Sequence, residues 1–362
     1  MCGLVNRLEL YNDHLHTVRS SMFLKWNSAL RRRQWLSVAF ITVFVSTTAI
    51  FEIFTAHKSV RRPFLTPVKY LDPLDDADAR ILAPHYAALV AEFADELRTE
   101  FAAAEAFTAL TKGSDVVCKG QIGRVEASML YIAIRVERPR HVVEVGALCG
   151  SSTRWILAAL NRNGGNGALT TFDLNDVAPR FMSLSGSANT DRWKFIHSDV
   201  LTYIREFEES VVTEADLIFI DALHRNAFAQ VYTRELLGHM RRRVLVFVHD
   251  IYSPFMIPIY KTCQMTMTEE TLDEERQCIL MRATEFTRRQ GTDTFYGPTQ
   301  AGGEGAELTS WLARTGRSRG LVTFSPYAAP EFSRHVFKAF RHAGLDFSQI
   351  NNPSIFFELQ PA

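Results

Sequence analysis

Short, nearly continuous apolar runs alternate with amphipathic stretches through the second half of the chain. Apolar runs of this kind are typical of strands that are buried on both faces, and the stretches between them have helical spacing. Strands that alternate with helices indicate a parallel sheet covered on both sides. The expected strands are HVVEVG, ALTTFDL, WKFIHSDV, ADLIFIDA and RRVLVFVHD, with helices at Ser151–Asn161, LTYIREFEE and NAFAQVYTRELLGHM between them.

Further elements are expected on either side of these strands. Residues 77–111 are rich in Ala, Leu, Glu and Phe at helical spacing, and we expect Pro84 in the first turn of a helix there. Gly120–Val136 predicts another helix with one apolar face. Residues 261–318 are polar and partly Gly-rich, which indicates a helix followed by an insertion. The strands GLVTFSP and SIFFELQ, with the helix PEFSRHVFKAFRHAG between them, complete the chain.

The stretch QWLSVAFITVFVSTTAIFEIFTAH (residues 34–57) differs because it is apolar on every side. From Trp35 to Phe51, 17 residues carry no charge, close to the roughly 20 that a membrane-spanning helix needs. An amphipathic helix would show a polar stripe. We therefore expect a single transmembrane helix. A buried core helix and a cleaved signal peptide are the alternatives, and the 33 preceding residues disfavour the signal peptide.

Basic residues on both sides of this stretch bear on its orientation. Lys25 and Arg31–Arg33 precede it, while Lys58, Arg61 and Arg62 follow it. The positive-inside rule slightly favours a cytoplasmic N-terminus. The rest of the chain would then face the outside of the cell or the lumen of the endoplasmic reticulum or Golgi, although the side stays open.

Length and charge narrow the organisation of the chain and its partners. With 362 residues, it can form one or two domains with a well-buried core. Lys plus Arg and Asp plus Glu both number 40. The chain thus lacks the basic surplus that nucleic-acid phosphates require, and we expect no nucleic-acid partner. The predicted segments are a tail (1–33), a transmembrane helix (34–57), a linker with a helical lead-in (58–118) and a domain (119–362) with an insertion around 261–318.

The five cysteines give no sign of a metal site, because no Cys-x-x-Cys pair is present. Cys263 and Cys278 could pair in an oxidising compartment. Cys149 lies in the turn after the first strand, where its small size explains it better than reactivity would.

That turn has the features of a ligand-binding loop. Gly146 lets the backbone turn sharply and Gly150 lets it approach a ligand. Ser151, Ser152 and Thr153 stand at the start of the next helix, where N–H groups and hydroxyls can hold a polar or anionic group. The G-x-G-x-x-G fingerprint of nicotinamide enzymes and the P-loop Gly-Lys-Ser/Thr are both missing.

Three acids complete the chemistry of these strand ends. Glu144 precedes the turn, and its carboxylate is compatible with a ligand that carries a positive charge. Asp173 ends the second strand, where a carboxylate can take both hydroxyls of a ribose. Asp199 ends the third strand, where its carboxylate could accept a hydrogen bond from an adenine amine. An amino acid head, a ribose and an adenine are the parts of S-adenosylmethionine.

The strand ends also resemble a known family. VVEVGALCGSST, TTFDL, FIHSDVL, DLIFIDALH and VLVFVHD look like the successive motifs of class I S-adenosylmethionine-dependent methyltransferases. The nearest type is the small-molecule and sugar O-methyltransferases, whose fourth strand ends in D-x-x-H and whose fifth ends in H-D or E-D. The resemblance is good over residues 120–255 and poor beyond. It implies a doubly wound, mostly parallel, Rossmann-like α/β sheet. The expected cofactor contacts are Glu144, Gly146, Ala147, Gly150, Ser151, Ser152, Asp173 and Asp199.

Four titratable residues follow the fourth and fifth strands: Asp221 and His224 after one, His249 and Asp250 after the other. Because neighbouring parallel strands end at the same edge, we expect these residues to converge over the cofactor. Methylation of a hydroxyl requires removal of its proton, and a histidine near neutral pKa suits that role. A divalent metal could also lower the pKa of the hydroxyl.

The resemblance implies roles for these four residues. Asp221, His249 and Asp250 would bind a divalent metal, Mg or Mn, and His224 would act as the base with Asp221 beside it. His249 departs from the acid usual at its position, and a histidine favours softer metals or leaves the site without one. The alternatives are a packing role for His249, a loop position for His224, and orientation of cofactor or substrate by Asp221 and Asp250.

We therefore expect a membrane-anchored methyltransferase that methylates a hydroxyl of a small molecule or glycan, with S-adenosylmethionine as cofactor. The alternatives are a nicotinamide-dependent oxidoreductase, which the missing fingerprint disfavours, and a catalytically inactive, membrane-tethered cofactor-binding protein. We also expect that the chain can form a homo-oligomer.

Overall fold

The structure is a computed structural model. It describes residues 64–65, 76–112, 118, 122–186, 190–207, 210–224, 226–251, 304–324, 330–345 and 354–362. These residues belong to one compact unit, 63–362. The predicted tail (1–33) and the predicted membrane span (34–57) lie outside the described residues. Within the described ranges, no helix has both the length and the apolar character needed to cross a membrane.

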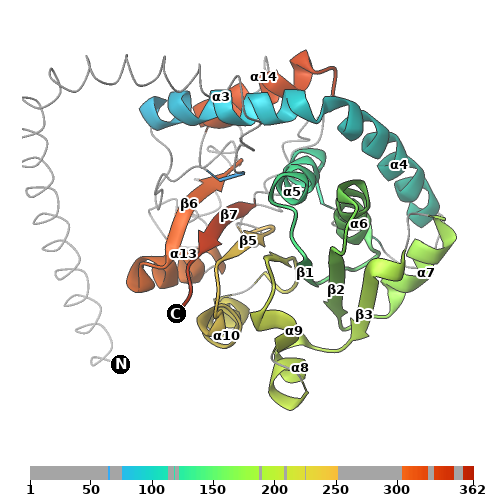
Figure 1. Cartoon of the computed structure of the whole chain (residues 1–362). Coiled ribbons are helices and arrows are strands. Elements are labelled where there is room, and N and C mark those ends of the chain that lie inside the picture. The colour runs from blue at the N-terminus through green and yellow to red at the C-terminus, as the bar shows by residue number, and fades with distance from the viewer. Residues whose placement is uncertain are drawn as a thin grey trace, which may run out of the picture. The chain divides into compact units, whose positions relative to one another are not determined.

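A seven-stranded sheet organises this unit (Figure 1). Its strands are β1 (His141–Val145), β2 (Ala168–Asp173), β3 (Trp193–His197), β4 (Leu217–Ile220), β5 (Val244–Val248), β6 (Ser318–Thr323) and β7 (Ile355–Leu359). Their order across the sheet is β3-β2-β1-β4-β5-β7-β6. The pairs from β3 to β5 are parallel, while β7 runs antiparallel to β5 and β6. The expected doubly wound, mostly parallel sheet is confirmed.

The direction of winding reverses at β1. The chain goes from β1 to β2 and β3 on one side, and then places β4 and β5 on the other side. In open α/β sheets, ligands bind outside the carboxyl ends of the strands where the order reverses. Here that place lies at the ends of β1 and β4, where Val145 is in register with Ile220.

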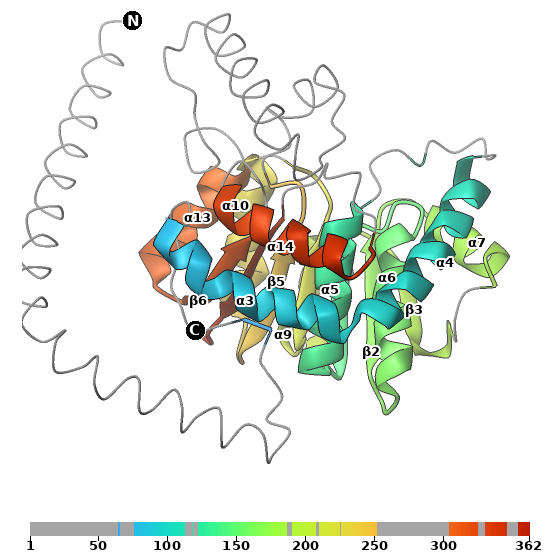
Figure 2. The same cartoon turned by 90° about the horizontal axis from the view of Figure 1, so that it is seen from above.

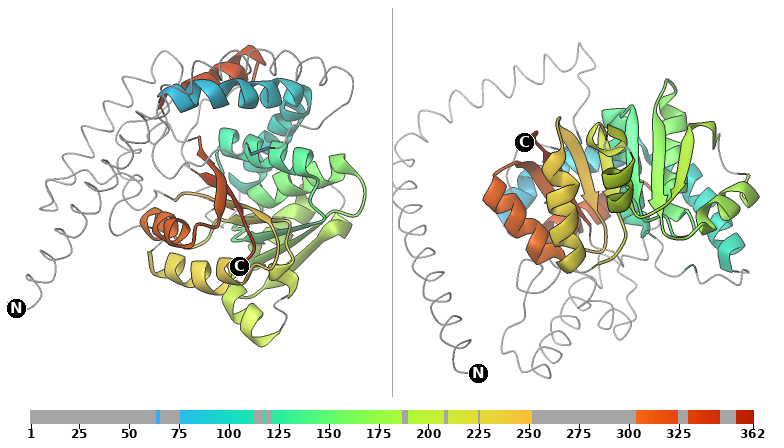
Figure 3. Two further views of the ribbon diagram at one scale, coloured as in Figure 1. Left: turned by 60° about the vertical axis from the view of Figure 1, so that its left-hand side comes forward. Right: turned by 90° about the horizontal axis from the view of Figure 1, so that it is seen from below.

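Helices cover the sheet on both faces. They are α3 (Asp76–Glu92), α4 (Ala94–Lys112), α5 (Arg124–Glu137), α6 (Ser151–Asn163), α7 (Val177–Leu184), α8 (Val200–Glu206), α9 (Ser210–Thr213), α10 (Asn226–Glu235), α13 (Glu304–Thr315) and α14 (Pro330–His342), with short 3₁₀ turns at Thr190–Arg192 and Leu237–His239. Helices α5 and α6 pack together on one face, and α10 and α13 pack together on the other (Figure 3). Helices α3 and α14 lie side by side beyond α5 (Figure 2).

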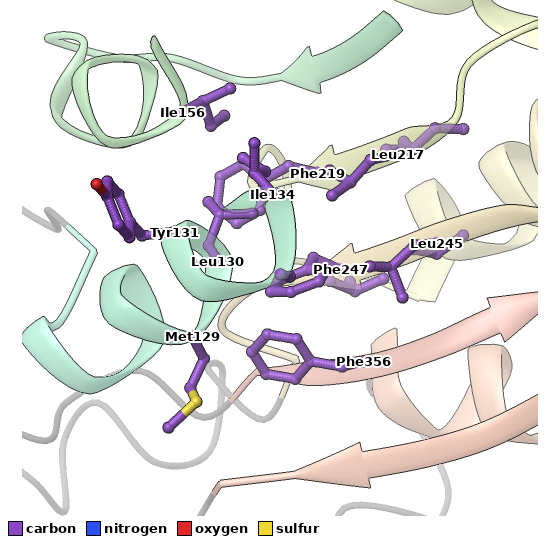
Figure 4. Close-up of a cluster of buried hydrophobic side chains, with 14 of the residues drawn as sticks. Met129, Leu130, Tyr131, Ile134, Ile156, Leu217, Phe219, Leu245, Phe247 and Phe356 are labelled. Carbon is purple, nitrogen blue, oxygen red and sulfur yellow. The ribbon is translucent and has the colours of Figure 1, made fainter. Parts of the chain in front are cut away.

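The core between α5 and the sheet is apolar and aromatic. Figure 4 shows Leu130 and Ile134 of α5 close to Phe219 of β4 and Phe247 of β5. Phe247 is in register with Phe356 of β7, and their ring centroids are 3.8 Å apart. Burial of one such side chain contributes about 1.5–3 kcal/mol. This packing fixes the positions at which β4 and β5 end, and with them the residues that follow.

The flanking segments differ in part from expectation. Pro84 lies inside α3 and not in a first turn, so that prediction was wrong. Pro84 is exposed, and it has no N–H to donate to the preceding turn of the helix. Of the predicted insertion at 261–318, the described part contains α13, which packs against α10.

Candidate functional site

The turn between β1 and α6 comes very close to the end of β4. Gly146 (φ +90°) and Gly150 (φ +89°) both have left-handed backbone conformations that favour glycine. A Cβ atom on Gly146 would lie 2.0 Å from the backbone oxygen of Asp221. Leu148, between the two glycines, also has a positive φ of 48°. Such a conformation is uncommon for a bulky residue and is often found at functional sites.

Asp173 ends β2 and holds this turn in place. Its Oδ2 atom accepts hydrogen bonds from the backbone N–H groups of Ala147 at 2.7 Å and Leu148 at 2.8 Å. Its Oδ1 atom accepts a hydrogen bond from the N–H of Asn175 at 2.8 Å. The structure therefore brings the glycine turn and Asp173 together at one edge of the sheet, as the sequence predicted.

Glu144 lies beneath the turn and is completely buried. Its carboxylate accepts hydrogen bonds from the hydroxyls of Ser152 at 2.6 Å, Thr153 at 2.7 Å and Thr171 at 2.8 Å. The indole N–H of Trp193 donates in turn to the Thr171 hydroxyl at 2.9 Å. Burial raises the pKa of Glu144 to about 7, against the three hydroxyl hydrogen bonds that lower it.

These contacts bear on two residues that the sequence placed in the cofactor site. The side chains of Glu144 and Ser152 bond each other under the turn, so in this conformation neither is available to a ligand. They instead tie β1 to α6.

Helix α6 begins at Ser151, and its N-cap residue Gly150 has no side chain to cap the first turn. Such a helix start attracts anionic groups through its N–H groups and dipole.

Asp199 lies further along the same edge, after β3. It is the N-cap of α8, and its carboxylate accepts hydrogen bonds from the N–H of Leu201 at 3.1 Å and the hydroxyl of Thr202 at 3.3 Å. A cap role is therefore visible, while the predicted contact with adenine stays a prediction.

Three large apolar side chains follow neighbouring strands at this edge. Leu148, Leu174 and Leu223 come after β1, β2 and β4 and are 36%, 71% and 52% exposed. A series of exposed apolar side chains beside polar groups is typical of a binding surface.

A disulfide joins the turn to the segment that follows α4. Cys149 is bonded to Cys118, and their Cα atoms are 5.8 Å apart. Small size alone therefore does not explain Cys149, and that interpretation was wrong. The other expected pair, Cys263 and Cys278, lies outside the described residues.

The four residues after β4 and β5 converge, as the sequence predicted. His249 Nδ1 is 2.9 Å from Asp221 Oδ1, which is a hydrogen bond. His224 Nε2 lies 3.5 Å from Asp221 Oδ1 and 3.9 Å from Asp250 Oδ2. The backbone of Asp250 has a φ of 50°. The side chain of His224 is 23% exposed, whereas that of His249 is fully buried.

Two further acids belong to this cluster, and the sequence analysis missed both. Glu304 of α13 places Oε2 3.3 Å from His224 Nδ1, with a side chain only 2% exposed. Glu126 of α5 is 1% exposed, and neither of its carboxylate oxygens is hydrogen-bonded within the described residues. Glu126 had a sequence signal, because it lies three and four residues before Met129 and Leu130 and so shares a helix face with apolar side chains. Glu304 had none, since GGEGAE has no periodicity.

Burial and mutual attraction shift the pKa values in this cluster. Burial opposes the charge of His249, but Asp221 and Asp250 outweigh it and raise its pKa to about 9. Burial likewise opposes the charge of His224, while Glu304, Asp221 and Asp250 raise its pKa above the usual value. Burial raises the pKa of Glu126 to about 8, although the attraction of His249 lowers it.

This arrangement does not fit the predicted divalent metal. In the described part of the chain, no three His, Cys, Asp or Glu side chains are placed to hold a metal ion. His249 uses Nδ1 to contact Asp221, another of the three expected ligands. The metal role of Asp221, His249 and Asp250 therefore plays no part in the chemistry below.

Comparison with known protein families identifies the kind of domain that these residues form. Residues 143–251 match the family described as a methyltransferase domain. These residues form a methyltransferase domain. The matched range runs from β1 past β5, so the domain includes the glycine turn, Asp173 and the four clustered residues. The sequence resemblance to class I S-adenosylmethionine-dependent methyltransferases is confirmed, while the subgroup with D-x-x-H stays a prediction.

Solved structures of methyltransferases resemble the chain distantly. One is the O-methyltransferase from Bacillus cereus in complex with SAH, at 12% identity over 72% of this chain and 91% of that chain, with a TM-score of 0.46. Another is the O-methyltransferase TomG from Streptomyces achromogenes in complex with SAM, at 13% identity over 72% and 88%, with a TM-score of 0.41. No curated protein sequence matches the chain.

Proposed function

We propose that this protein transfers the methyl group of S-adenosylmethionine to a hydroxyl of a small molecule or glycan. One observation above all supports this proposal. The glycine turn of the methyltransferase domain meets the end of β4 at Gly146 and Asp221, so a cofactor on that turn would lie next to His224, which can accept a proton.

The residues at the turn suit the parts of this cofactor. The uncapped start of α6 can receive the carboxylate of the amino acid part. Asp173 can accept hydrogen bonds from the ribose hydroxyls, and the exposed leucines offer apolar contact for the adenine ring. Asp199 is our candidate for the adenine amine. A nicotinamide dinucleotide would lack its glycine fingerprint here.

The chain's own residues supply the proton chemistry. The bound cofactor supplies a methyl group that is already activated on a positively charged sulfur. The acceptor hydroxyl approaches His224, and its proton moves to Nε2 as its oxygen forms a bond to the methyl carbon. The bond between carbon and sulfur breaks, and its electron pair goes to sulfur. Asp221 and Asp250, 3.5 and 3.9 Å from Nε2, stabilise the imidazolium that results.

Isothermal titration calorimetry on the full chain in detergent tests the cofactor. We would titrate S-adenosylmethionine, S-adenosylhomocysteine and NAD, each with and without Mg²⁺ or Mn²⁺. Micromolar binding of the two adenosyl compounds without NAD binding is the expected result and justifies a screen of hydroxyl acceptors. No heat from either adenosyl compound would overturn the proposal. A gain in affinity with metal would restore the metal site that the geometry disfavours.

We also propose that residues 34–57 anchor the chain in a membrane, with the methyltransferase domain on the lumenal or outer side. The charge-free run from Trp35 to Phe51 supports this proposal. Flotation with phospholipid vesicles tests the anchor. The full chain should float, and Phe44→Lys should weaken flotation, because a charge at the centre of a span is costly. Equal flotation of both proteins would count against a span.

A further inference from the structure

The carboxylate of Glu304 is placed behind the histidine that faces the acceptor. Glu304 stands at the start of α13, 80 residues beyond His224, and its Oε2 is 3.3 Å from His224 Nδ1. A carboxylate that is only 2% exposed is costly unless it has partners. The helix pair α10 and α13 holds both residues, because α10 begins just after His224 at Asn226 and packs along α13.

We infer that Glu304 is the positioning residue of His224, holding the proton of the neutral ring on Nδ1 and leaving Nε2 free to take the proton of the acceptor. This inference rests on the proposed function. A neutral imidazole has one N–H donor and one acceptor nitrogen, and the partner of the first nitrogen decides which is which. A carboxylate only accepts hydrogen bonds, so the Nδ1 atom must carry the proton in order to donate a hydrogen bond to Glu304.

The surroundings of the other nitrogen agree with this assignment. Nε2 lies 3.5 Å from Asp221 Oδ1 and 3.9 Å from Asp250 Oδ2, both longer than an ordinary hydrogen bond. Asp221 is already hydrogen-bonded to His249 at 2.9 Å. The groups that face His224 are therefore Glu304 on one side and Asp221 with Asp250 on the other, and only the Glu304 contact fixes a nitrogen. An acceptor hydroxyl can then approach Nε2 directly.

A purely structural role for Glu304 gives different expectations. An acid in the first turn of a helix stabilises that helix by its charge alone. Glu307 provides a matched control, because it also lies in the first turn of α13, but its carboxylate pairs with Arg314 at 3.2 Å. If charge at the helix start were all that mattered, Glu304→Gln and Glu307→Gln would behave alike.

The ring of His224 can be observed directly, without an acceptor. We would label histidine with ¹⁵N in the full chain, assign His224 by its loss in His224→Gln, and record the nitrogen shifts above the pH at which the ring deprotonates. The wild type and Glu307→Gln should show the proton on Nδ1. Glu304→Gln should move the population toward Nε2, because an amide can donate to Nδ1. Glu304→Asp should restore part of the wild-type state.

Turnover gives the second measurement, with the first hydroxyl acceptor that the screen identifies. Glu304→Gln should lower kcat at least about 100-fold, as loss of the orienting acid does in other histidine bases, with the affinity for S-adenosylmethionine changed less than about twofold. An unchanged tautomer in Glu304→Gln would overturn the inference. The inference would also be overturned if Glu304→Gln lost enough affinity for S-adenosylmethionine, or enough thermal stability, to account for its loss of turnover. Failure of the wild type to bind S-adenosylmethionine would instead overturn the proposed function, while the tautomer result would still stand.

Discussion

The Cα of Gly146 faces the backbone oxygen of Asp221 so closely that a Cβ atom would lie 2.0 Å from that oxygen. The contact joins the turn after β1 to the end of β4, and so joins the turn proposed to bind the cofactor to the residues that lead to His224. Neither partner can move aside easily, because both belong to backbone at the ends of buried, paired strands. The spacing between the turn proposed to bind the cofactor and the residues proposed to face the acceptor is thus set by the packing of two strands.

Gly146→Ala should therefore destabilise the domain severely, by several kcal/mol, because it adds a clash to a strained φ of +90°. Gly164→Ala is the control for strain alone, since its φ is +64° but nothing lies within 4 Å of the added atom. We expect it to cost about 1–3 kcal/mol, because a φ of 64° with a ψ of −158° is a conformation that is essentially confined to glycine. Urea denaturation followed by circular dichroism measures both. Equal costs would mean that the contact with Asp221 relaxes without penalty.

Asp173→Ala should weaken binding of S-adenosylmethionine more than tenfold, a loss of about 1.4 kcal/mol or more. The change removes the acceptor of the Ala147 and Leu148 N–H groups together with the proposed ribose contact. Asp199→Ala should cost less affinity, because its carboxylate holds Leu201 and Thr202 of α8, whereas that of Asp173 holds the glycine turn itself. Calorimetry on the two variants gives the comparison. An unchanged affinity in Asp173→Ala would rule out the ribose assignment.

The fold could be predicted from the sequence because its determinants are local. The apolar runs at Leu217–Ile220 and Val244–Val248 are buried along their whole length. Such runs can be recognised as buried strands in a sequence without any knowledge of the segments that pack against them. The convergence of Asp221 with His249 followed from a second general rule, that neighbouring parallel strands end at one edge. These rules also placed the glycine turn beside Asp173.

What could not be predicted depends on contacts between distant segments. Glu304 reaches His224 across 80 residues, and Cys118 reaches Cys149 across 31. Nothing in the local pattern around Glu304 or Cys118 shows which partner it will meet. The buried position of Glu144 was also hidden, because its three hydroxyl partners are distributed over α6 and β2. An acid before a glycine turn reads the same in sequence whether it faces a ligand or the core.

Glu144 should make the stability of the domain depend on pH. Its pKa is raised from 4.5 to about 7 in the folded state, so folding favours the protonated form. The stabilisation is fully present below about pH 4.5 and is lost as the pH rises to about 7, where the folded form also ionises. Relative to Glu144→Gln, the wild type should lose on the order of 3 kcal/mol across this interval. Denaturation curves of both proteins at pH 4.5, 6 and 8 measure the difference. A constant difference would show that Glu144 titrates normally.

The disulfide between Cys118 and Cys149 should stabilise both the domain and its cofactor turn. It closes a loop with a sequence separation of 31 residues, for which loop entropy gives about 3–4 kcal/mol. Cys149 lies between Leu148 and Gly150, two residues with positive φ, so release of the bond frees the backbone where the cofactor is proposed to bind. Reduction with dithiothreitol should therefore lower both the urea midpoint and the affinity for S-adenosylmethionine. With Cys263→Ser and Cys278→Ser present in both proteins, Cys118→Ser should reproduce the reduced wild type and should not respond to the reductant. A wild type whose midpoint and affinity survive reduction would show that the turn keeps its shape without the bond.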